Sequence, residues 1–599
     1  MSQSSDTQRV HFLILLFLGI GALLLIALFA FFFKAWGSDK RPPNLKTTKI
    51  DHSIRGNIYS SDKFTLATSE KLYKVSINPK SIDPNKKELF VNLFSIYSGI
   101  PRSTIISKLN SNRYTTLSYN ISTITAANLK LLNTKLDRYR VFREYEEYGR
   151  VIQKMGIDLE VSGYRRNYPY GDTMEPILGY TQKIQNQRIT KVSGVKGSEK
   201  NNNQYLQAKQ DGTLSGFRDV GFNVIRNKYA SSQAKQDGID ITLTIPLSLQ
   251  KRIETILDTA NQKLQAKEIL VGVMDSKSGR ILTLASSKRF DPKNIKKDDY
   301  SALNISATEV SFEPGSIIKP VIYAILLQKN LIPHEQKIFL HNGAYRIGRY
   351  IIRDDHPLKE ATPEEILLRS SNIGMIKLTQ NLASKDFLDA MHHYGFGEKT
   401  NIDLPQEASG VLPSIKKLKG SYKASVSYGY GFRATFIQLL RAYASFSNGG
   451  YLITPRIISH LSYEGELYRF KTQQPTSIIS SQDALEVQDI LRDIIKEGTG
   501  RRAKVEGIDM GGKTGTARIF VDQKYTKRYN SSFFGFAQDS KNSYTIGVVI
   551  FDPNVEEGYY GSKTAAPLFK NIVELLIQEK YLTPTSPQAL SDDSMQTKN

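Results

Sequence analysis

The chain has 599 residues, so at about 100–200 residues per domain its length predicts roughly three to five folded units. Its 40% hydrophobic content excludes wholesale disorder, and its lack of cysteine excludes disulfides, thiolate metal sites and cysteine nucleophiles. The net charge of +23 lies in scattered lysine pairs without a basic stripe, so nucleic-acid binding is not expected.

Residues 12–34 predict a transmembrane signal anchor. Phe12 to Phe33 is a run of 22 residues without a charge, long enough at about 1.5 Å per residue to cross a hydrocarbon core about 30 Å thick. Lys34 and Trp36 then offer an interfacial anchor rather than a cleavage site. Residues 1–11 are expected in the cytoplasm. The lysines after the span would by themselves favour the opposite orientation, but long domains cross a membrane largely regardless of charge.

Two extramembrane domains are expected after the span. Residues 45–235 mix short β-like runs with helical ones, including Leu129–Lys154, and show no evident chemistry. Residues 237–580 begin with an alternating, strand-like run, Ile239–Ile245, followed by an amphipathic helix, Leu247–Gln262.

The second domain predicts an α+β fold. Ile269–Asp275 and Arg280–Ser286 read as a hairpin around Ser278-Gly279, and a helical middle follows over residues 316–446. Strands at both ends of a domain that enclose helices predict one sheet built from sequence-distant strands. The later strand signals are at 510–520, 531–537 and 544–551. Residues 582–599 are rich in Ser, Pro, Asp and Thr and are expected to be a disordered tail.

Ser316 and Lys319 form a Ser-x-x-Lys pair. The run Glu313–Pro320 predicts a turn that delivers Ser316 to the first turn of a helix, where Pro320 is tolerated. At i+3, Lys319 would lie on the same face as Ser316, near enough for an unprotonated amine to take the hydroxyl proton. The pair alone proves nothing, because its spacing recurs in the chain. It recurs at Ser60, Ser193, Ser232, Ser248 and Ser414.

A Ser-x-Asn triplet, Ser370-Ser371-Asn372, comes next. Thr362 and Glu365 predict the capping box of a helix that leads into it. The same triplet pattern also begins at Ser118 and Ser540, so this motif is also weak by itself.

The third motif is Lys513-Thr514-Gly515-Thr516. Along a strand, Lys513 and Gly515 alternate with Thr514 and Thr516, and the glycine permits close backbone approach. Such a strand at a sheet edge can present an ammonium group and hydroxyls to a substrate carboxylate. The competing triplet Lys277-Ser278-Gly279 precedes Ser316, which is the wrong order.

The order of the three motifs makes them specific. Ser-x-Asn begins 54 residues after Ser316, and Lys-Thr-Gly begins another 143 residues later. This is the constellation of penicillin-binding proteins and class A β-lactamases. The combination is therefore a strong indication although each of its parts is weak.

The chain resembles a class B penicillin-binding protein over nearly its whole length. Arg55-Gly56-Asn57-Ile58 looks like the family's opening element, and the chain departs from the family pattern shortly afterwards, at Ser60, Ser61 and Lys63. The other matching motifs are Arg166–Gly171 with Gly179-Tyr180, Gly194–Glu199, Ser427–Gly431, Ala442–Ala444 with Asn448–Gly450, and Tyr560-Gly561 with Ala565–Pro567.

The resemblance implies a bitopic inner-membrane protein with a periplasmic pedestal over 45–235 and a D,D-transpeptidase domain over 237–580, whose antiparallel sheet is flanked by helices. Ser316 would attack the penultimate D-Ala carbonyl with Lys319 as general base, and the N–H groups of Ser316 and Thr516 would form the oxyanion hole. No metal or cofactor is required. The remaining implied roles are proton relay and peptide binding for Ser370 and Asn372, and carboxylate recognition for Lys513, Thr514, Gly515 and Thr516.

The resemblance also implies partners: nascent peptidoglycan, β-lactams as inhibitors, other division proteins, and a polytopic glycosyltransferase of the shape, elongation, division and sporulation (SEDS) group. Four details favour a septal, FtsI-like member. They are Glu313-Pro314-Gly315 before the nucleophile, Thr514 in the third motif, Ser531-Ser532-Phe533 with Gly535, and no large insertion between the motifs.

Three alternatives remain open. The chain could be an elongation-type transpeptidase. It could be a membrane-anchored serine β-lactamase or D,D-carboxypeptidase, but no convincing Glu-x-x-x-Asn deacylation element lies between Asn372 and Lys513. It could also be a catalytically idle division scaffold, against which the intact Ser316, Lys319 and Lys513 argue.

Overall fold

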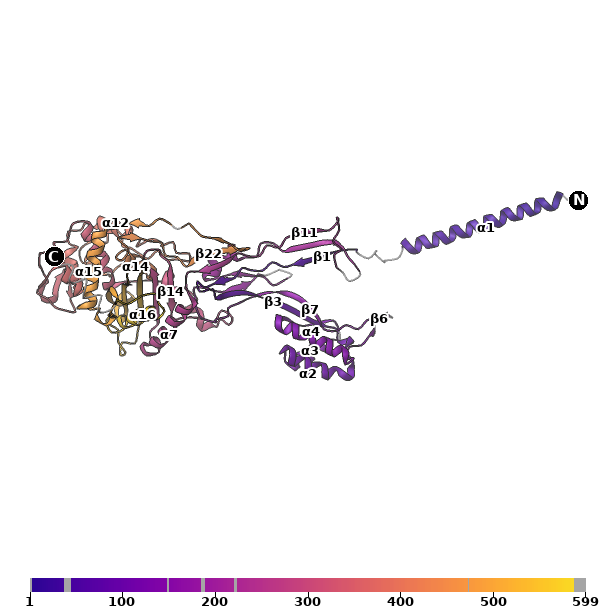
Figure 1. The fold of residues 1–599 in the computed structure, drawn as a ribbon, viewed down its shortest axis with the longest axis horizontal. Coiled ribbons are helices and arrows are strands. Elements are labelled where there is room, and N and C mark those ends of the chain that lie inside the picture. Colours follow the sequence, from indigo (N-terminus) through magenta and orange to yellow (C-terminus); the bar gives the residue numbers. More distant parts are fainter. Residues whose placement is uncertain are drawn as a thin grey trace. The chain divides into compact units, whose positions relative to one another are not determined.

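The computed structural model describes residues 3–36, 45–111, 113–147, 150–184, 189–219, 223–471 and 473–585. The chain divides into two compact units, which are Met1–Ser53 with Gln210–Gln236, and Ile54–Lys209 with Asp237–Asn599. Both units draw on segments that are distant in the sequence. Figure 1 shows helices and strands mixed along the chain, and the α+β prediction is confirmed.

The first unit contains the apolar helix α1 (Gln3–Trp36) and a small antiparallel sheet. Within α1, Thr7–Trp36 is long and apolar enough to cross a membrane, so the helix starts earlier than the predicted span. The sheet has the order β1-β10-β11, and Asp211 accepts hydrogen bonds from the backbone and hydroxyl of Ser53 beside it (2.9 and 2.6 Å). Its strands are β1 (Lys46–Asp51), β10 (Gly212–Phe217) and β11 (Ser231–Gln233).

A seven-stranded sheet of the second unit joins the two predicted domains. Its order is β23-β22-β12-β2-β3-β4, with β7 also paired to β3. The predicted strand over Ile239–Ile245 is confirmed as β12, which lies between a strand from residues 58–59 and one from 458–463. The strands are β2 (Ile58–Tyr59), β3 (Thr65–Ile77), β4 (Thr115–Ser122), β7 (Asp158–Asn167), β12 (Asp240–Leu243), β22 (Ile458–Tyr463) and β23 (Glu466–Tyr468).

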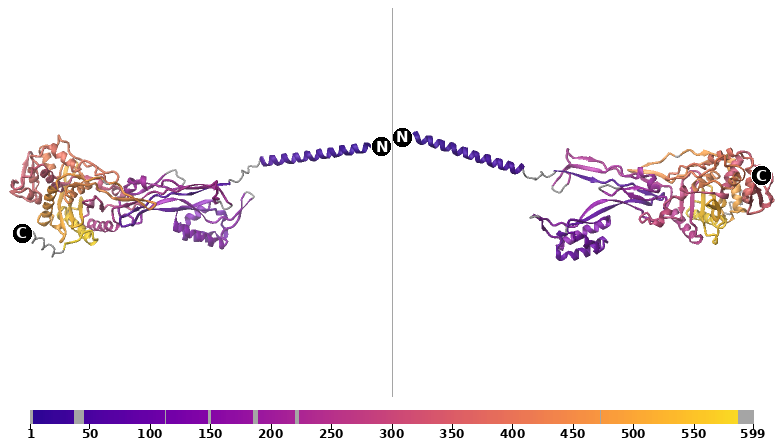
Figure 2. Two further views of the ribbon diagram at one scale, coloured as in Figure 1. Left: turned by 45° about the horizontal axis from the view of Figure 1, so that its top comes forward. Right: turned by 180° about the vertical axis from the view of Figure 1, so that it is seen from behind.

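Three helices form a lobe beside β3 and β7, visible in Figures 1 and 2. They are α2 (Lys87–Ser98), α3 (Arg102–Leu109) and α4 (Thr123–Arg138). The predicted helix over Leu129–Lys154 was wrong beyond Arg138. Arg140 has φ +53°, the Val141 N–H donates to the Leu136 carbonyl, and Val141 is buried. Core packing therefore ends the helix before the predicted end at Lys154. A short hairpin, β5 (Tyr145–Glu147) and β6 (Arg150–Ile152), follows.

A buried ion triad ties together three of the predicted pedestal motifs. Glu199 has no solvent exposure, and its carboxylate receives hydrogen bonds from Arg55 Nε (2.8 Å) and Arg166 Nε (2.6 Å). Arg166 also donates to the Gly56 carbonyl (2.7 Å). Burial raises the pKa of Glu199, but the attraction of the two guanidinium groups outweighs burial, and its pKa lies below the usual value.

The five-stranded antiparallel sheet, order β14-β13-β27-β26-β25, is the centre of the predicted transpeptidase domain. Alternate residues of β13 point to opposite faces. Ile269 and Val271 pack in one core with helices α7 (Leu247–Leu264) and α16 (Ala565–Gln578), and Leu270 packs in another core with α14 (Phe436–Ala444). The predicted hairpin and the three later strands are confirmed, and β25 is an edge strand. The strands are β13 (Glu268–Asp275), β14 (Ile281–Ser286), β25 (Asp509–Val521), β26 (Lys524–Gln538) and β27 (Ser543–Phe551).

Helices cover both faces of this sheet and fill the predicted helical middle. That middle also holds small two-stranded pairs, among them β15 (Ser311–Phe312) with β20 (Ala434–Thr435), and the hairpin β17 (Ala344–Ile347) with β18 (Tyr350–Arg353). The helices used below are α5 (Gly197–Asn201), α6 (Asn203–Leu206), α7 (Leu247–Leu264), α9 (Lys319–Gln328), α10 (Pro363–Leu368), α11 (Asn372–Leu378), α14 (Phe436–Ala444), α15 (Ser481–Lys496) and α16 (Ala565–Gln578).

The start of the predicted tail is ordered in the structure. Leu582, its first residue, is buried, and the Thr585 N–H donates to the Gly507 carbonyl (2.8 Å). The rest of the predicted tail, 586–599, lies outside the described residues.

We expect Glu199→Ala to lower the free energy of unfolding by about 3–5 kcal/mol, because it leaves two buried guanidinium groups without a counter-charge. Urea unfolding of the detergent-solubilised chain measures this. Glu160→Ala is the matched control: Glu160 forms an exposed ion pair with Lys74 (2.6 Å), and its loss should cost no more than about 1 kcal/mol. Equal losses for the two variants would contradict a structural role for the triad.

Candidate active site

Ser316 lies in a tight turn that is held from several sides. A 3-10 turn, Gly315–Ile318, runs directly into α9, and Pro320 occupies the first turn of that helix, as predicted. Gly315 has φ +60° and donates its N–H to the Gly429 carbonyl (3.0 Å). A Cβ at Gly429 would stand 2.0 Å from the Gly315 carbonyl oxygen, so this close approach requires glycine.

Lys319 is fully buried and joins the first motif to the second. Its Nζ donates to the carbonyl of Ser370 (2.6 Å) and to Asn372 Oδ1 (2.8 Å), and lies 3.3 Å from Ser370 Oγ. Burial lowers the pKa of Lys319 to about 7, although Asp354 and Asp355 act in the opposite direction. A substantial fraction of Lys319 can therefore be an unprotonated amine at neutral pH.

Ser370 is positioned by local backbone geometry. The predicted capping box of Thr362 and Glu365 is present at the start of α10, and Ser370 follows that helix with φ +60°. The next helix, α11, begins at Asn372 with Ser371 as its N-cap. The carboxylate of Asp354 lies at this helix start and accepts hydrogen bonds from the Asn372 N–H (2.6 Å) and Ser371 Oγ (2.6 Å). An acidic group at a helix N-terminus is stabilising, and here it fixes the position of Asn372.

Lys513 approaches Ser370 from the edge strand β25. Its buried Nζ donates to Ser370 Oγ (2.9 Å) and to the carbonyl of Thr514 (3.2 Å). Burial lowers the pKa of Lys513 well below its usual value, and the charge of Lys319 lowers it further. The Ser370 hydroxyl thus stands between two buried amines.

The rest of the third motif packs beside the Ser316 turn. A Cβ at Gly515 would come within 2.8 Å of the Ile317 side chain, so the strand can lie against the turn only with glycine at this position. Thr514 Oγ1 is hydrogen-bonded to Thr499 Oγ1 (2.8 Å), and Thr516 Oγ1 accepts from the Gly561 N–H (3.0 Å). The structure therefore brings the three sequence motifs together at one place.

One predicted contact is not made. Ser316 is half-buried, and among the described residues its Oγ has no hydrogen-bond partner. Lys319 Nζ is directed to Ser370 and Asn372 instead of to Ser316. Helical spacing predicted Lys319 and Ser316 on one face, but the Ser370 carbonyl and Asn372 Oδ1 accept the hydrogen bonds of the amine. Catalytic hydrogen bonds often tighten only when substrate is bound.

Sequence analysis missed two residues that position the site. Asp354 follows the β17–β18 hairpin within what was predicted to be a helical middle, and no motif pointed to its contact with α11. Thr499 lies in a Gly-Thr-Gly run after α15, and only tertiary packing places it beside Thr514. Gly429 belongs to a motif that the family resemblance had already identified.

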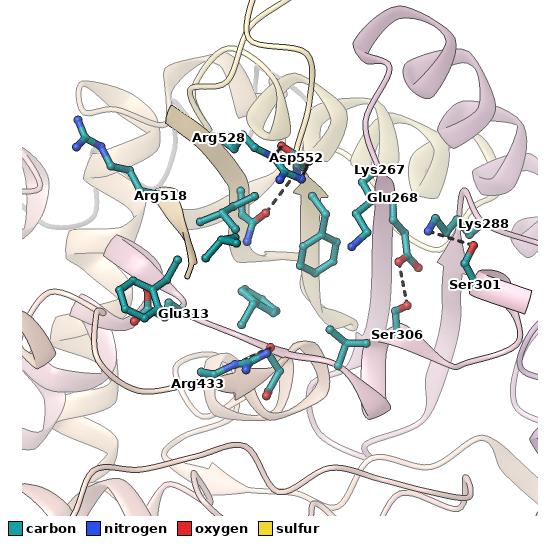
Figure 3. Close-up of a pocket in the computed structure, with 18 of the residues that line it drawn as sticks. Lys267, Glu268, Lys288, Ser301, Ser306, Glu313, Arg433, Arg518, Arg528 and Asp552 are labelled. Atoms are coloured by element: carbon teal, nitrogen blue, oxygen red, sulfur yellow. Dashed lines mark hydrogen bonds and ion pairs between the residues drawn. The ribbon is translucent and has the colours of Figure 1, made fainter. Parts of the chain in front are cut away.

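A cavity of about 550 Å³ is lined by Glu313, among other residues (Figure 3). None of the predicted site residues lines it. Its acidic groups are already engaged: Glu268 accepts from Ser306 Oγ (2.9 Å), and Asp552 is paired with Arg528. This cavity is therefore separate from the cluster around Ser370.

Comparisons with known proteins identify the family. The family described as "Penicillin binding protein transpeptidase domain" matches residues 269–574, and "Penicillin-binding Protein dimerisation domain" matches residues 50–243. The chain belongs to the class B penicillin-binding proteins. It is a peptidoglycan D,D-transpeptidase, as the sequence resemblance implied.

The relatives cover most of this class B penicillin-binding protein. "Probable peptidoglycan D,D-transpeptidase PenA" of Neisseria gonorrhoeae is 30% identical over 430 residues, which are 71% of this chain and 70% of that protein. "Peptidoglycan D,D-transpeptidase FtsI" of Buchnera aphidicola is 27% identical over 547 residues, 90% of this chain and 89% of that protein. The crystal structure of Penicillin Binding Protein 2X from Streptococcus thermophilus has the same fold, with a TM-score of 0.73 at 20% identity over 89% of this chain and 80% of that chain.

Proposed function

We propose that this penicillin-binding protein cross-links peptidoglycan stem peptides through an acyl-enzyme on Ser316. The observation that carries the proposal is the buried hydrogen-bonded cluster of Lys319, Ser370 and Lys513 next to the Ser316 turn. Acyl transfer requires a base beside the nucleophile, and here two lysines with lowered pKa values contact a serine next to the half-buried Ser316.

In the first half-reaction, Ser316 Oγ attacks the carbonyl of the penultimate D-Ala while unprotonated Lys319 accepts the hydroxyl proton. The N–H groups of Ser316 and Thr516 would stabilise the tetrahedral oxyanion. The C–N bond then breaks, and the departing D-Ala amine takes up a proton through Ser370, which contacts both lysines. An ester between Ser316 and the shortened peptide remains.

In the second half-reaction, the amine of a neighbouring stem peptide attacks the ester carbonyl. Lys319 or Ser370 takes the amine proton, the C–O bond to Ser316 breaks, and the serine regains its proton. The terminal carboxylate of the donor peptide would be recognised by Lys513 with the hydroxyls of Thr514 and Thr516, and Asn372 would hold the peptide amide. β-Lactams would be trapped at Ser316 by the same first step.

The proposal extends to the protein's place in the cell. We infer that α1 is a single membrane anchor and that everything after Lys34 is periplasmic, because cell-wall peptides are cross-linked outside the cytoplasm. The four sequence details given above support a septal role, with a SEDS-type glycosyltransferase and other division proteins as partners. A reporter fused after Tyr581 that works only in the cytoplasm would contradict this topology.

Ser316→Ala should abolish covalent labelling by a fluorescent penicillin, because the half-buried hydroxyl is the proposed nucleophile. Lys319→Ala should slow labelling by about 10²- to 10⁴-fold, the usual effect of removing an acid–base group. Ser414→Ala, which carries the same spacing at an exposed position, is the control and should label normally. Labelling that persists at Ser414 or Ser232 would show that the nucleophile is assigned incorrectly. Rapid turnover of the adduct would instead favour the β-lactamase alternative.

Acylation should also depend on pH. Lys319 can accept a proton only when it is unprotonated, and burial lowers its pKa to about 7. The second-order rate of penicillin acylation should therefore fall by about tenfold for each unit of pH below about 7 and level off above it. Stopped-flow measurement at constant ionic strength tests this. A rate that stays constant as the pH falls below 7 would exclude Lys319 as the base.

Depletion of the protein tests the septal role. If it acts at the septum, depleted cells should grow as filaments with unfinished septa, because elongation continues while division stops. Microscopy after repression of the gene gives the readout. Round or swollen cells would place the protein in the elongation machinery instead.

A further inference from the structure

A second cavity, of about 600 Å³, lies between the pedestal helices α5 and α6 and four stretches of the transpeptidase segment. None of the six predicted catalytic residues lines it. One of its loops carries Lys277 and Ser278, from the triplet that was rejected as a catalytic motif. The lining residues that matter here are Asn201, Tyr205, Lys277, Asn401, Arg456 and Phe470.

Arg456 is the unusual feature of this cavity. Its Nε is buried and has no hydrogen-bond partner, and within the described residues its guanidinium group forms no ion pair. The two nearby carboxylates are already engaged. Asp403 accepts the N–H groups of Ile457 (2.7 Å) and Ile458 (2.8 Å), and Asp275 is paired with Arg280 (3.2 Å). A buried donor without a partner is costly, so this arginine is suited to an anionic group supplied by a ligand.

The remaining walls combine amides with aromatic rings. Asn201 and Asn401 are exposed side chains at the cavity; Asn201 Nδ2 donates to the Asp403 carbonyl (3.0 Å) and leaves its amide oxygen as an acceptor. Tyr205 and Phe470 meet edge to face with ring centroids 5.9 Å apart. Phe470 is 45% exposed. Amide groups pair with hydroxyl and N-acetyl groups, and an aromatic ring packs against the apolar C–H face of a sugar. Lys277 adds a second positive charge at the rim.

We propose that this cavity binds a segment of glycan strand whose N-acetylmuramic acid residues carry free lactyl carboxylates, without reacting with it. Arg456 and Lys277 would bind the carboxylate, the asparagine amides would bind the N-acetyl and hydroxyl groups, and Phe470 would pack against a sugar ring. The inference rests on the proposed function only in the choice of ligand, because peptidoglycan is the polymer on which the enzyme acts. The volume is within the range of small-ligand sites.

The test measures binding by isothermal titration calorimetry with the full-length Ser316→Ala protein in detergent, so that no acyl transfer interferes. The probe is an octasaccharide of alternating N-acetylglucosamine and N-acetylmuramic acid without stem peptides. A neutral N-acetylglucosamine octamer is the second arm, and the same octasaccharide carrying stem peptides, which lacks free lactyl carboxylates, is the third. The peptide-free octasaccharide should bind most tightly, because only it offers a lactyl carboxylate to Arg456.

Arg456→Met in the Ser316→Ala protein should lower the affinity for the peptide-free octasaccharide by about tenfold or more, as expected for the loss of a charge-assisted hydrogen bond. Phe470→Ala should lower the same affinity by about threefold or more. Arg502→Met is the matched control, since Arg502 is exposed and does not line the cavity, and it should bind normally. Arg456→Met should leave the melting temperature unchanged or raise it, because it removes an unsatisfied buried donor.

Unchanged affinity in both Arg456→Met and Phe470→Ala, or no detectable binding of the octasaccharide, would overturn the proposal. Equal binding of the neutral octamer, or tighter binding of the peptide-bearing strand, would overturn the assignment of the lactyl carboxylate. If Arg456→Met fails to fold, Phe470→Ala at its exposed position still decides the question. Penicillin labelling of the chain with Ser316 intact is measured separately, so failure here is distinct from failure of the transpeptidase proposal.

Discussion

The site depends on one hydroxyl, that of Ser370, placed between two buried amines. Lys319 and Lys513 come from a helix and a strand that are far apart in the sequence, and each contacts Ser370. Burial disfavours the charged form of both, and the charge of Lys319 disfavours that of Lys513 further. Protonation states in which both lysines are charged are therefore disfavoured. One lysine can then act as a base while the other binds a carboxylate.

The surrounding structure keeps this arrangement in place. Asp354 binds the start of α11 and fixes Asn372, the Gly429 carbonyl holds the turn before Ser316, and Gly515 lets the edge strand lie against Ile317. None of these contacts involves a reacting group. They place three segments at hydrogen-bond distance, and small errors in such placement are costly for catalysis.

The fold was predictable where a local pattern repeats or a short motif is specific. Alternating residues identified β12, the Ser278-Gly279 turn identified the β13–β14 hairpin, and Thr362 with Glu365 identified the start of α10. Prediction failed at Arg138, because the burial of Val141 ends α4 there and the charged residues that follow carry no information about that contact. Leu582 was assigned to a disordered tail for the same reason: its burial depends on elements that are distant in the sequence.

By itself the sequence determined the apolar span, the order of the Ser-x-x-Lys, Ser-x-Asn and Lys-Thr-Gly motifs, and through them the family. These features are local, or are fixed by order along the chain. Only the tertiary structure decided that Lys319 contacts Ser370 rather than Ser316 and that Asp354 and Thr499 support the site. It also decided that Arg456 Nε is buried without a hydrogen-bond partner in the described part of the chain. These hydrogen bonds and this burial depend on which sequence-distant segments come into contact. The spacing of residues within one segment does not predict those contacts.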